Sequence, residues 1–257
     1  ASLLFGDSTS GAALYSGYIQ YQHNGDYMIL AAGAAERLRV TANAGANVVI
    51  ADGLTLSAGN LITNTLGGTT NLRIGLNAGD TIADGALYNT LIGTNAGTAI
   101  TTGDSNVAIG TDALMTEDAH ANNVAIGQHA LRLQDAGQDA YNVAVGYHAG
   151  AVISTGISNT LIGGLAGDAL TDGDNNVALG TYALTTETRA DKNVAVGSYS
   201  LATQNVGTDT DTFNVAVGYA AGYTVSTGIQ NTLIGGVAGD ALDVGSFNVV
   251  MGTSALG

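Results

Sequence analysis

The chain has 257 residues, with 38 Gly but no Cys, Pro or Trp, and a formal net charge of −15. Because the phosphates of a nucleic acid need a basic surface, 21 acidic residues against 6 Lys and Arg argue against a nucleic-acid partner. No apolar run is long enough for membrane insertion. Without Cys there are no disulfides and no zinc-thiolate sites.

Residues 1–65 form the first predicted domain, a short β module that lacks the repeat found further along the chain. Residues 18–22 and 27–30 show the alternation of strands, and Asn24-Gly25 between them is a strong signal for a type I′ hairpin turn. Further strands are predicted at residues 37–40, 47–50 and 54–56.

Residues 66–257 form the second predicted domain, in which the pattern Asn-x-x-x-Gly recurs eleven times with aliphatic residues inside it. Successive motifs lie 17 to 21 residues apart, and 17 is the commonest spacing. Such regularity indicates a repeat architecture. The motifs begin at Asn71, Asn89, Asn106, Asn123, Asn142, Asn159, Asn176, Asn193, Asn214, Asn231 and Asn248.

Each repeat is predicted to contain a strand followed by a turn. In the motif at residues 106–110, Val107 and Ile109 point to one face of the strand and Ala108 points to the other. Three and four residues after the motif glycine, the sequence is Ala-Gly in some repeats and Ala-Leu or Ser-Leu in others, and a second short strand is expected there. The two kinds alternate in pairs, which gives a superperiod of four repeats, about 70 residues.

A single repeat of this length buries too little apolar surface to fold alone, so the repeats are expected to stack. Stacking places each motif asparagine over the next and allows an asparagine ladder. The motif glycine suits a tight corner or a positive φ, and the absence of proline suits unbroken backbone ladders. The predicted fold is therefore all-β, a β-solenoid or β-roll of eleven repeats of about 17 residues.

Residues 36–41, Glu-Arg-Leu-Arg-Val-Thr, follow the predicted hairpin and resemble the distal shaft of the tail fibres of tailed bacteriophages. The Asn-Val-Ala-Ile-Gly and Asn-Thr-Leu-Ile-Gly repeats resemble repeat regions of such fibres, and they are similar to the head domains of trimeric autotransporter adhesins. Both resemblances imply an elongated homotrimer that is exposed outside the cell and takes part in adhesion. The repeat here is longer than the coils typical of adhesin heads, so their coil geometry is not carried over.

Five tyrosines follow the predicted strands at corner positions. Tyrosine offers a stacking face and a hydroxyl group, which suits contacts with sugars or protein receptors. The alternative interpretation is that these rings cover gaps between the chains of a trimer. The candidate receptor contacts are Tyr147, Tyr182, Tyr199, Tyr219 and Tyr223.

Two features suggest metal binding, and each has a simpler interpretation. His129 and His148 are equivalent residues of consecutive repeats, so stacking would place them in one surface column able to ligate a metal. A solvated ladder is preferred, because other residue types follow in that column. Asp168 and residues 172–175 resemble an oxygen-rich calcium loop but lack the spacing and bidentate Glu of an EF-hand, so a polar turn is preferred. The sequence therefore predicts no metal and no cofactor.

Paired carboxylates are the nearest candidates for catalysis, since glycoside hydrolysis needs two of them at a defined separation. Glu117 with Asp118, and Asp135 with Asp139, are such pairs, but they lie in predicted turns without a recurring constellation. No catalytic residue is therefore predicted, and the chain is not expected to be an enzyme.

Together these features predict a structural and adhesive fibre protein, a phage tail fibre that attaches to the host-cell surface. Its predicted partners are further copies of itself, as a homotrimer, and a glycan or protein receptor on the host. Neither nucleic-acid binding nor membrane insertion is expected, and the predicted location is the virion or otherwise extracellular. The first alternative is a bacterial cell-surface adhesin or extracellular filament subunit, and the second is a polysaccharide-degrading tailspike.

Overall fold

A computed structural model describes residues 71–83 and 85–257, together with five strands among the first 70 residues. The contacts of the chain divide it into two units, Ala1–Leu61 and Ile62–Gly257, and each is described by itself. The five strands of the first unit are β1 (Ser2–Phe5), β2 (Gly17–Gln22), β3 (Tyr27–Ala32), β4 (Ala35–Thr41) and β5 (Val48–Val49).

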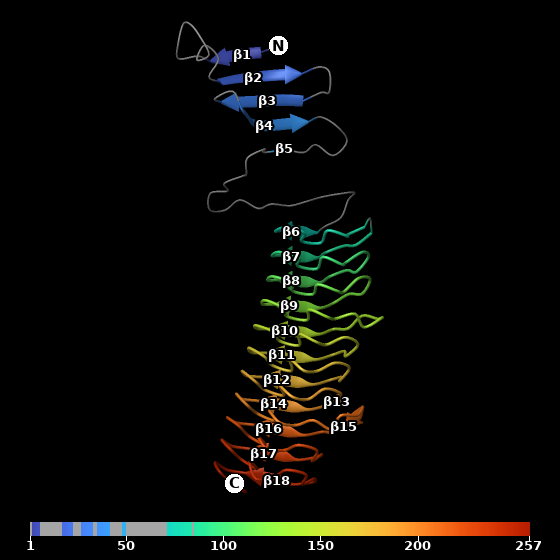
Figure 1. The fold of residues 1–257 in the computed structure, drawn as a ribbon, viewed down its shortest axis with the longest axis vertical. Coiled ribbons are helices and arrows are strands. Elements are labelled where there is room, and N and C mark those ends of the chain that lie inside the picture. The colour runs from blue at the N-terminus through green and yellow to red at the C-terminus, as the bar shows by residue number, and fades with distance from the viewer. Residues whose placement is uncertain are drawn as a thin grey trace. The chain divides into compact units, whose positions relative to one another are not determined.

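The first unit contains an antiparallel sheet in which the strands β1 to β5 follow one another in chain order (Figure 1). Strands β2 and β3 pair with Gln22 opposite Tyr27, so the predicted hairpin pairing is confirmed, while its turn at residues 23–26 lies outside the described residues. Strand β4 includes the predicted strand at residues 37–40, and β5 lies within residues 47–50. The strand predicted at residues 54–56 also lies outside the described residues.

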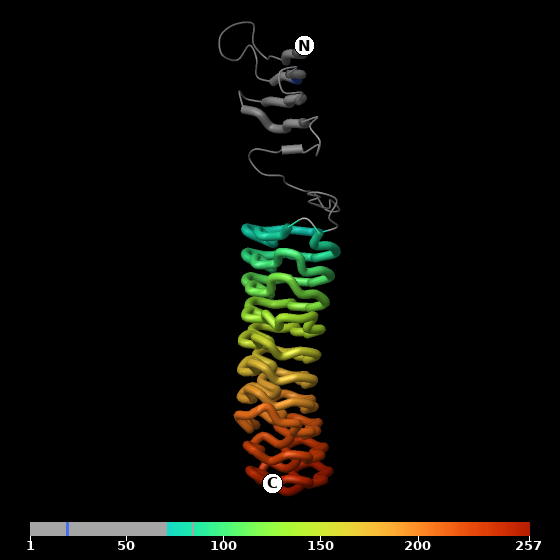
Figure 2. The backbone as a smooth tube through the Cα atoms, turned by 90° about the vertical axis from the view of Figure 1, so that its right-hand side faces the viewer, coloured from blue at the N-terminus to red at the C-terminus, as the bar shows by residue number. Residues whose placement is uncertain are grey.

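The second unit is a parallel β-solenoid of eleven turns, as the repeat predicts (Figures 1 and 2). Each turn contributes one strand of three residues, and neighbouring strands pair in parallel, as Val143 with Thr160 illustrates. No helix occurs among the described residues, so none of them forms a helix that could cross a membrane. The strands are β6 (Leu72–Ile74), β7 (Thr90–Ile92), β8 (Val107–Ile109), β9 (Val124–Ile126), β10 (Val143–Val145), β11 (Thr160–Ile162), β12 (Val177–Leu179), β14 (Val194–Val196), β16 (Val215–Val217), β17 (Thr232–Ile234) and β18 (Val249–Met251).

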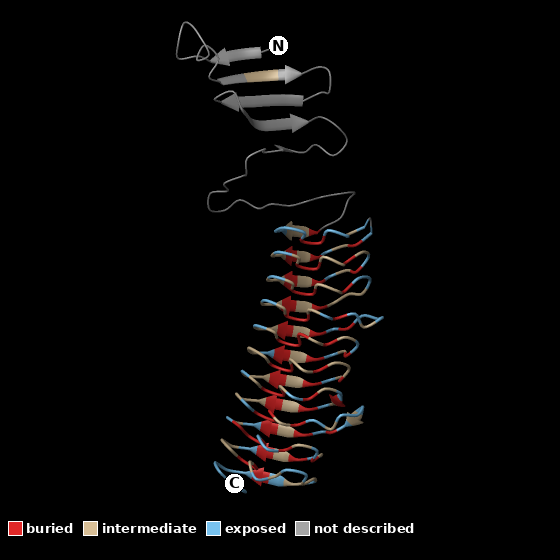
Figure 3. Ribbon diagram, in the orientation of Figure 1, coloured by how far each residue is buried: buried red, intermediate tan, exposed pale blue. Residues whose placement is uncertain are grey.

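The strands alternate between core and surface as their sequences predict. In β8 the middle residue, Ala108, is fully buried, while Val107 and Ile109 on the other face are half-buried. The same pattern recurs from turn to turn, so Figure 3 shows a row of buried residues along the stack. The inner row forms one continuous core. On the outer face, the third residue of every strand is aliphatic or Met and is partly reached by water, so these residues form an outer aliphatic row, while the first residue is threonine in three turns.

The Ala-Gly and Ala-Leu repeats alternate in pairs because the volume of the core side chains must stay balanced from turn to turn. Strand β11 carries Leu161 in its middle, and a Cβ atom on either Gly150 or Gly167 would lie only 2.8 Å from a Cδ atom of this leucine. In the next turn the middle residue is Ala178, and Leu184 is buried in the core. A central leucine therefore needs glycine in its own turn and in the preceding turn, which explains why the Ala-Gly repeats occur in pairs.

The second strand expected at the Ala-Leu and Ala-Gly positions is wrong, because the backbone there turns through left-handed conformations. Gly150 has a φ of 56° and Leu184 has a φ of 54°. These residues still bond neighbouring turns, since the N–H of Gly150 donates to the carbonyl of Ala166 at 3.0 Å and that of Leu184 donates to the carbonyl of Ser200 at 3.0 Å. In the second unit, further strand pairing is described only between β13 (Ala190–Asp191) and β15 (Thr210–Asp211).

The asparagine column is confirmed, and most of its side-chain bonds go to the backbone of the next turn. Asn159 is fully buried. Its Nδ2 donates to the carbonyl of Gly173 at 2.8 Å, and its Oδ1 accepts from the N–H of Asn176 at 2.9 Å. The motif glycines are confirmed at positive φ, with +141° at Gly163, where a Cβ atom would lie 2.5 Å from the carbonyl oxygen of Gly180.

Candidate binding site

Four of the five candidate tyrosines lie together on the surface of the solenoid, with Tyr199 in the middle. The rings of Tyr182 and Tyr199 stack with centroids 5.1 Å apart and an interplanar angle of 15°. Tyr219 and Tyr223 approach Tyr199 edge-on, at 6.2 and 6.3 Å between centroids. The rings come from three consecutive turns, so the repeat brings residues 41 positions apart into one aromatic cluster.

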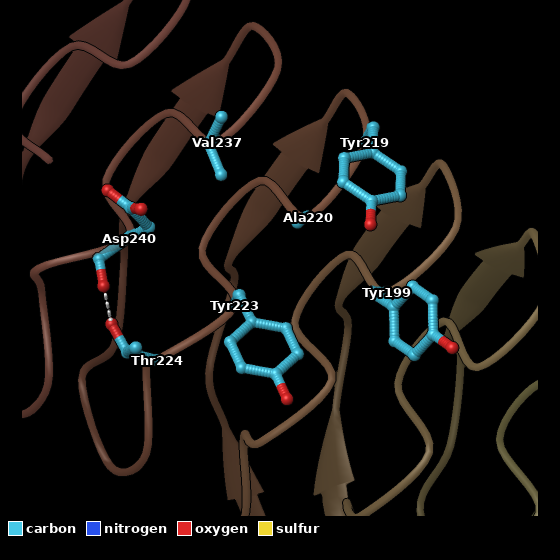
Figure 4. A pocket seen from close by; sticks show the side chains of 7 residues that line it. All are labelled: Tyr199, Tyr219, Ala220, Tyr223, Thr224, Val237 and Asp240. Atoms are coloured by element: carbon cyan, nitrogen blue, oxygen red, sulfur yellow. Dashed lines mark hydrogen bonds between the residues drawn. The ribbon is translucent and has the colours of Figure 1, made fainter.

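A pocket of about 490 Å³ opens beside this cluster, within the range typical of small-ligand sites. Its origin is a change of residue size along one column of equivalent positions, from Tyr182 and Tyr199 to Ala220 and then Val237. The small side chain at the third turn leaves a gap, and Figure 4 shows Ala220 between the surrounding tyrosine rings. The pocket is lined by Tyr199, Tyr219, Ala220, Tyr223, Thr224, Val237 and Asp240.

The pocket is aromatic on one side and polar on the other. Tyr219 is 63% exposed and Tyr223 is 42% exposed, so their rings remain available to a ligand. Across the pocket, the Thr224 hydroxyl donates to the backbone carbonyl of Asp240, which fixes its position (Figure 4). This arrangement suits a ligand with an apolar face and several hydroxyl groups, because the rings can stack on the face while phenol and hydroxyl groups bond its edge.

The fifth candidate, Tyr147, lies outside this cluster. Its ring packs against His148 with centroids 4.2 Å apart, and 54% of the residue is exposed. It does not line the pocket. The structure therefore groups Tyr182, Tyr199, Tyr219 and Tyr223 and places Tyr147 apart from them, against His148.

The two histidines in consecutive turns form a hydrogen-bonded ladder. Nδ1 of His129 lies 2.7 Å from Nε2 of His148, and Nε2 of His129 lies 3.2 Å from Oδ2 of Asp112. Asn95 extends the ladder, since its Nδ2 donates to Oδ1 of Asp112 at 2.9 Å. Burial lowers the pKa of His148 below its ordinary value, and the nearby His129 and Arg132 lower it further. The imidazole nitrogens thus bond each other directly, in the ladder arrangement that the sequence favours.

The acidic turn at residues 172–175 uses its carboxylates in bonds between turns. Oδ2 of Asp172 pairs with Nη2 of Arg189 at 2.9 Å, and Oδ1 of Asp174 accepts the N–H of Ile157 at 2.7 Å. Oδ1 of Asp168 accepts a bond from a threonine hydroxyl in the next turn at 2.5 Å. Burial raises the pKa of Asp168 above its ordinary value. These contacts fit a polar turn.

The structure differs most from the sequence prediction at the paired carboxylates. Glu117, Asp118 and Asp135 surround His120, a residue that the sequence interpretation does not single out. Asp139 bonds instead to the N–H of Ala121 at 3.0 Å. Burial raises the pKa of Glu117 above its ordinary value. One signal was present in the sequence, since Asp118 and Asp135 are separated by one repeat of 17 residues and therefore stack.

These observations define the chain as a repeat protein with a parallel β-solenoid and an aromatic pocket on its surface. No family model, curated protein or solved structure matches it. Function is therefore inferred from the solenoid, its surface and the sequence resemblance.

Proposed function

We propose that the protein is a structural and adhesive fibre of a phage virion, which binds a glycan on the host-cell surface through the tyrosine pocket. The cluster of Tyr182, Tyr199, Tyr219 and Tyr223 beside an open pocket is the observation that carries this proposal. The solenoid supports the structural part of the role, because bonds between successive turns hold the pocket on a continuous stack. In this role the protein binds its receptor without a catalytic step.

The outer aliphatic row supports the proposal that three chains associate. Ile74, Ile162, Val217 and Ile234 are each between 36 and 38% exposed, although they belong to the most apolar positions of the repeat. A continuous apolar stripe on a surface marks an interface with another protein surface. Three copies of one weak pocket would also raise the avidity for a surface that carries many identical glycans.

The mass of the protein in solution tests the association. We expect light scattering after size-exclusion chromatography to give three times 25.5 kDa for the purified full chain. Replacing Val196 and Val217, two neighbouring outer residues of the sheet, with aspartate should shift the mass toward one chain, since burying two charges at an interface is unfavourable. Circular dichroism would check that the variant stays folded. A wild-type protein with the mass of one chain would contradict the trimer.

Glycan binding tests the pocket. We expect Tyr223→Ala to weaken binding of the wild-type ligand, found by screening bacterial surface polysaccharides, by about tenfold, because one stacking ring is lost. Tyr199→Asn should act similarly, and asparagine suits the left-handed backbone there (φ 63°). Affinity is measured by calorimetry or surface plasmon resonance.

Tyr147→Ala is the matched control, because it removes an exposed tyrosine that does not line the pocket. We expect the affinity of this variant for the glycan to equal that of the wild type. Equal losses of affinity in Tyr147→Ala and Tyr223→Ala would indicate that the glycan binds outside the pocket. Release of reducing ends from the bound polysaccharide would contradict a purely adhesive role.

A further inference from the structure

We propose that Glu117, Asp118, His120 and Asp135 form a binding site for one divalent transition-metal ion of the zinc type. The first three residues lie between β8 and β9, and Asp135 lies one turn further along the stack. Each side chain offers a ligand atom, and these atoms all lie within 4.8 Å of one another. Within residues 71–83 and 85–257, no other group of three or more His, Asp or Glu side chains meets in this way.

The distances around His120 suit a metal centre. Its Nδ1 lies 2.9 Å from Oε1 of Glu117, 3.9 Å from Oδ1 of Asp118 and 3.9 Å from Oδ1 of Asp135. Ligand atoms on a tetrahedral zinc ion are about 3.3 Å apart, since each bond is about 2.0–2.1 Å long. Because no two of these atoms are more than 4.8 Å apart, side-chain rotations that move each atom by about 0.8 Å or less would bring all four into coordination range. Asp118 and Asp135 are each more than half exposed, which leaves the ion a path from solvent.

The negative charge of this cluster favours binding of a cation. Glu117 is fully buried, and its Oε2 has no hydrogen-bond partner. Two further carboxylates lie beside it, so three groups that can carry negative charge gather in one place. Among the described residues no Lys or Arg forms an ion pair with any of the three carboxylates, and His120 is the basic side chain that lies within 4.0 Å of all three. A divalent ion bound among the three carboxylates would offset this negative charge.

An equivalent loop one superperiod later shows which part of this arrangement the fold itself requires. There Glu187 occupies the place of Glu117 and is also fully buried. Its Oε1 accepts three backbone N–H groups, from Thr188 at 2.9 Å, Arg189 at 3.1 Å and Ala190 at 3.0 Å. Its Oε2 also lacks a partner, so the buried glutamate belongs to the loop and is not by itself a sign of metal.

The other three ligands are specific to the first loop. The second loop forms without a histidine or any further carboxylate at these places, so a turn of the solenoid can form around the buried glutamate without them. The corresponding residues, 70 positions apart, are Asp118 and Thr188, His120 and Ala190, and Asp135 and Asn205.

The ligand set favours zinc over calcium and magnesium. Calcium and magnesium prefer oxygen ligands alone, whereas an imidazole nitrogen suits zinc and its transition-metal neighbours. One nitrogen from His120 with three carboxylate oxygens therefore selects a borderline ion such as Zn²⁺. The proposal is independent of the glycan site, because it involves none of the tyrosines.

Calorimetric titration of the purified full chain with Zn²⁺, after removal of metals with a chelator, tests the site. We expect saturable binding of one ion per chain, and much weaker binding of Ca²⁺ and Mg²⁺. The variants Asp118→Thr, His120→Ala and Asp135→Asn each introduce the residue that the second loop carries. Each should weaken Zn²⁺ binding at least tenfold while the melting temperature of the metal-free protein changes by only a few degrees, because the same fold accommodates these residues one superperiod later.

His148→Asn is the matched control, since it removes a histidine of the ladder and leaves the proposed ligands in place. This variant should bind Zn²⁺ like the wild type, and X-ray absorption spectra of the zinc-loaded wild type should show one imidazole among oxygen ligands. Three results would overturn the proposal: no saturable Zn²⁺ binding, undiminished binding by the triple variant, or loss of binding in His148→Asn.

Discussion

Replacing Gly163 with alanine is expected to destabilise the solenoid by about 3 kcal/mol or more, one of the two largest effects we expect from a single substitution. The backbone at Gly163 has a φ of +141°, which residues with a Cβ atom rarely adopt. An added Cβ atom would also lie 2.5 Å from both the carbonyl carbon and the carbonyl oxygen of Gly180. Because Gly180 is backbone of the next turn, the contact can be relieved only by separating two turns.

The neighbouring residue, Gly164, provides the matched control. A Cβ atom there would meet nothing within 4 Å, and its φ lies outside the left-handed range. Gly164→Ala should therefore change the free energy of unfolding by no more than about 0.5 kcal/mol. Urea and thermal unfolding followed by circular dichroism would give both values. Similar effects for the two variants would show that the motif glycine is not required by its backbone geometry.

The features that the sequence predicts well are those that every turn needs. Each turn must approach its neighbour closely and satisfy buried backbone groups, so Gly163 and Asn159 have equivalents in all eleven motifs. Such requirements repeat with the turns and are visible as periodicity. The second strand was predicted wrongly because Leu184 is an ordinary strand residue by propensity but has a φ of 54° here. Bonds to the next turn override that local preference, and a single repeat does not reveal them.

The tyrosine cluster and the carboxylates around His120 depend on differences between repeats, and the sequence predicts these two groups less completely. Residue type and position in the repeat identify the five tyrosines in the sequence. That Tyr147 lies apart from the other four follows only from the turns in which these residues occur. The pocket also needs the small Ala220 in a column that carries Tyr199 one turn earlier. The site at His120 was missed because its ligands come from two turns, and only alignment of the repeats brings Asp135 beside it.

Replacing Asn159 with alanine is the second substitution with a large expected effect, a loss of about 2–5 kcal/mol in the free energy of unfolding. The change removes the acceptor for the N–H of Asn176 and the donor to the carbonyl of Gly173. Because Asn159 is fully buried, water cannot easily replace either bond. Asn205→Ala is the control, since Asn205 is exposed and its Oδ1 accepts only from a threonine hydroxyl at 3.2 Å. This variant should stay within about 0.5 kcal/mol of the wild type, and an equal loss would contradict the importance of the buried column.

Asn159→Asp separates the contribution of hydrogen bonding from that of packing, because the two side chains have nearly the same shape. The aspartate places an oxygen where Nδ2 donates to the carbonyl of Gly173. Burial of the charged form should raise the folded-state pKa of this aspartate above its unfolded value of about 3.9. The loss of stability relative to wild type should therefore be greatest near neutral pH and decrease as the pH falls through the raised folded pKa, since the protonated acid can donate the missing bond. The loss for Asn159→Ala should stay constant over the same range, and a constant loss for Asn159→Asp as well would indicate that packing, rather than the donor to Gly173, holds the turns together.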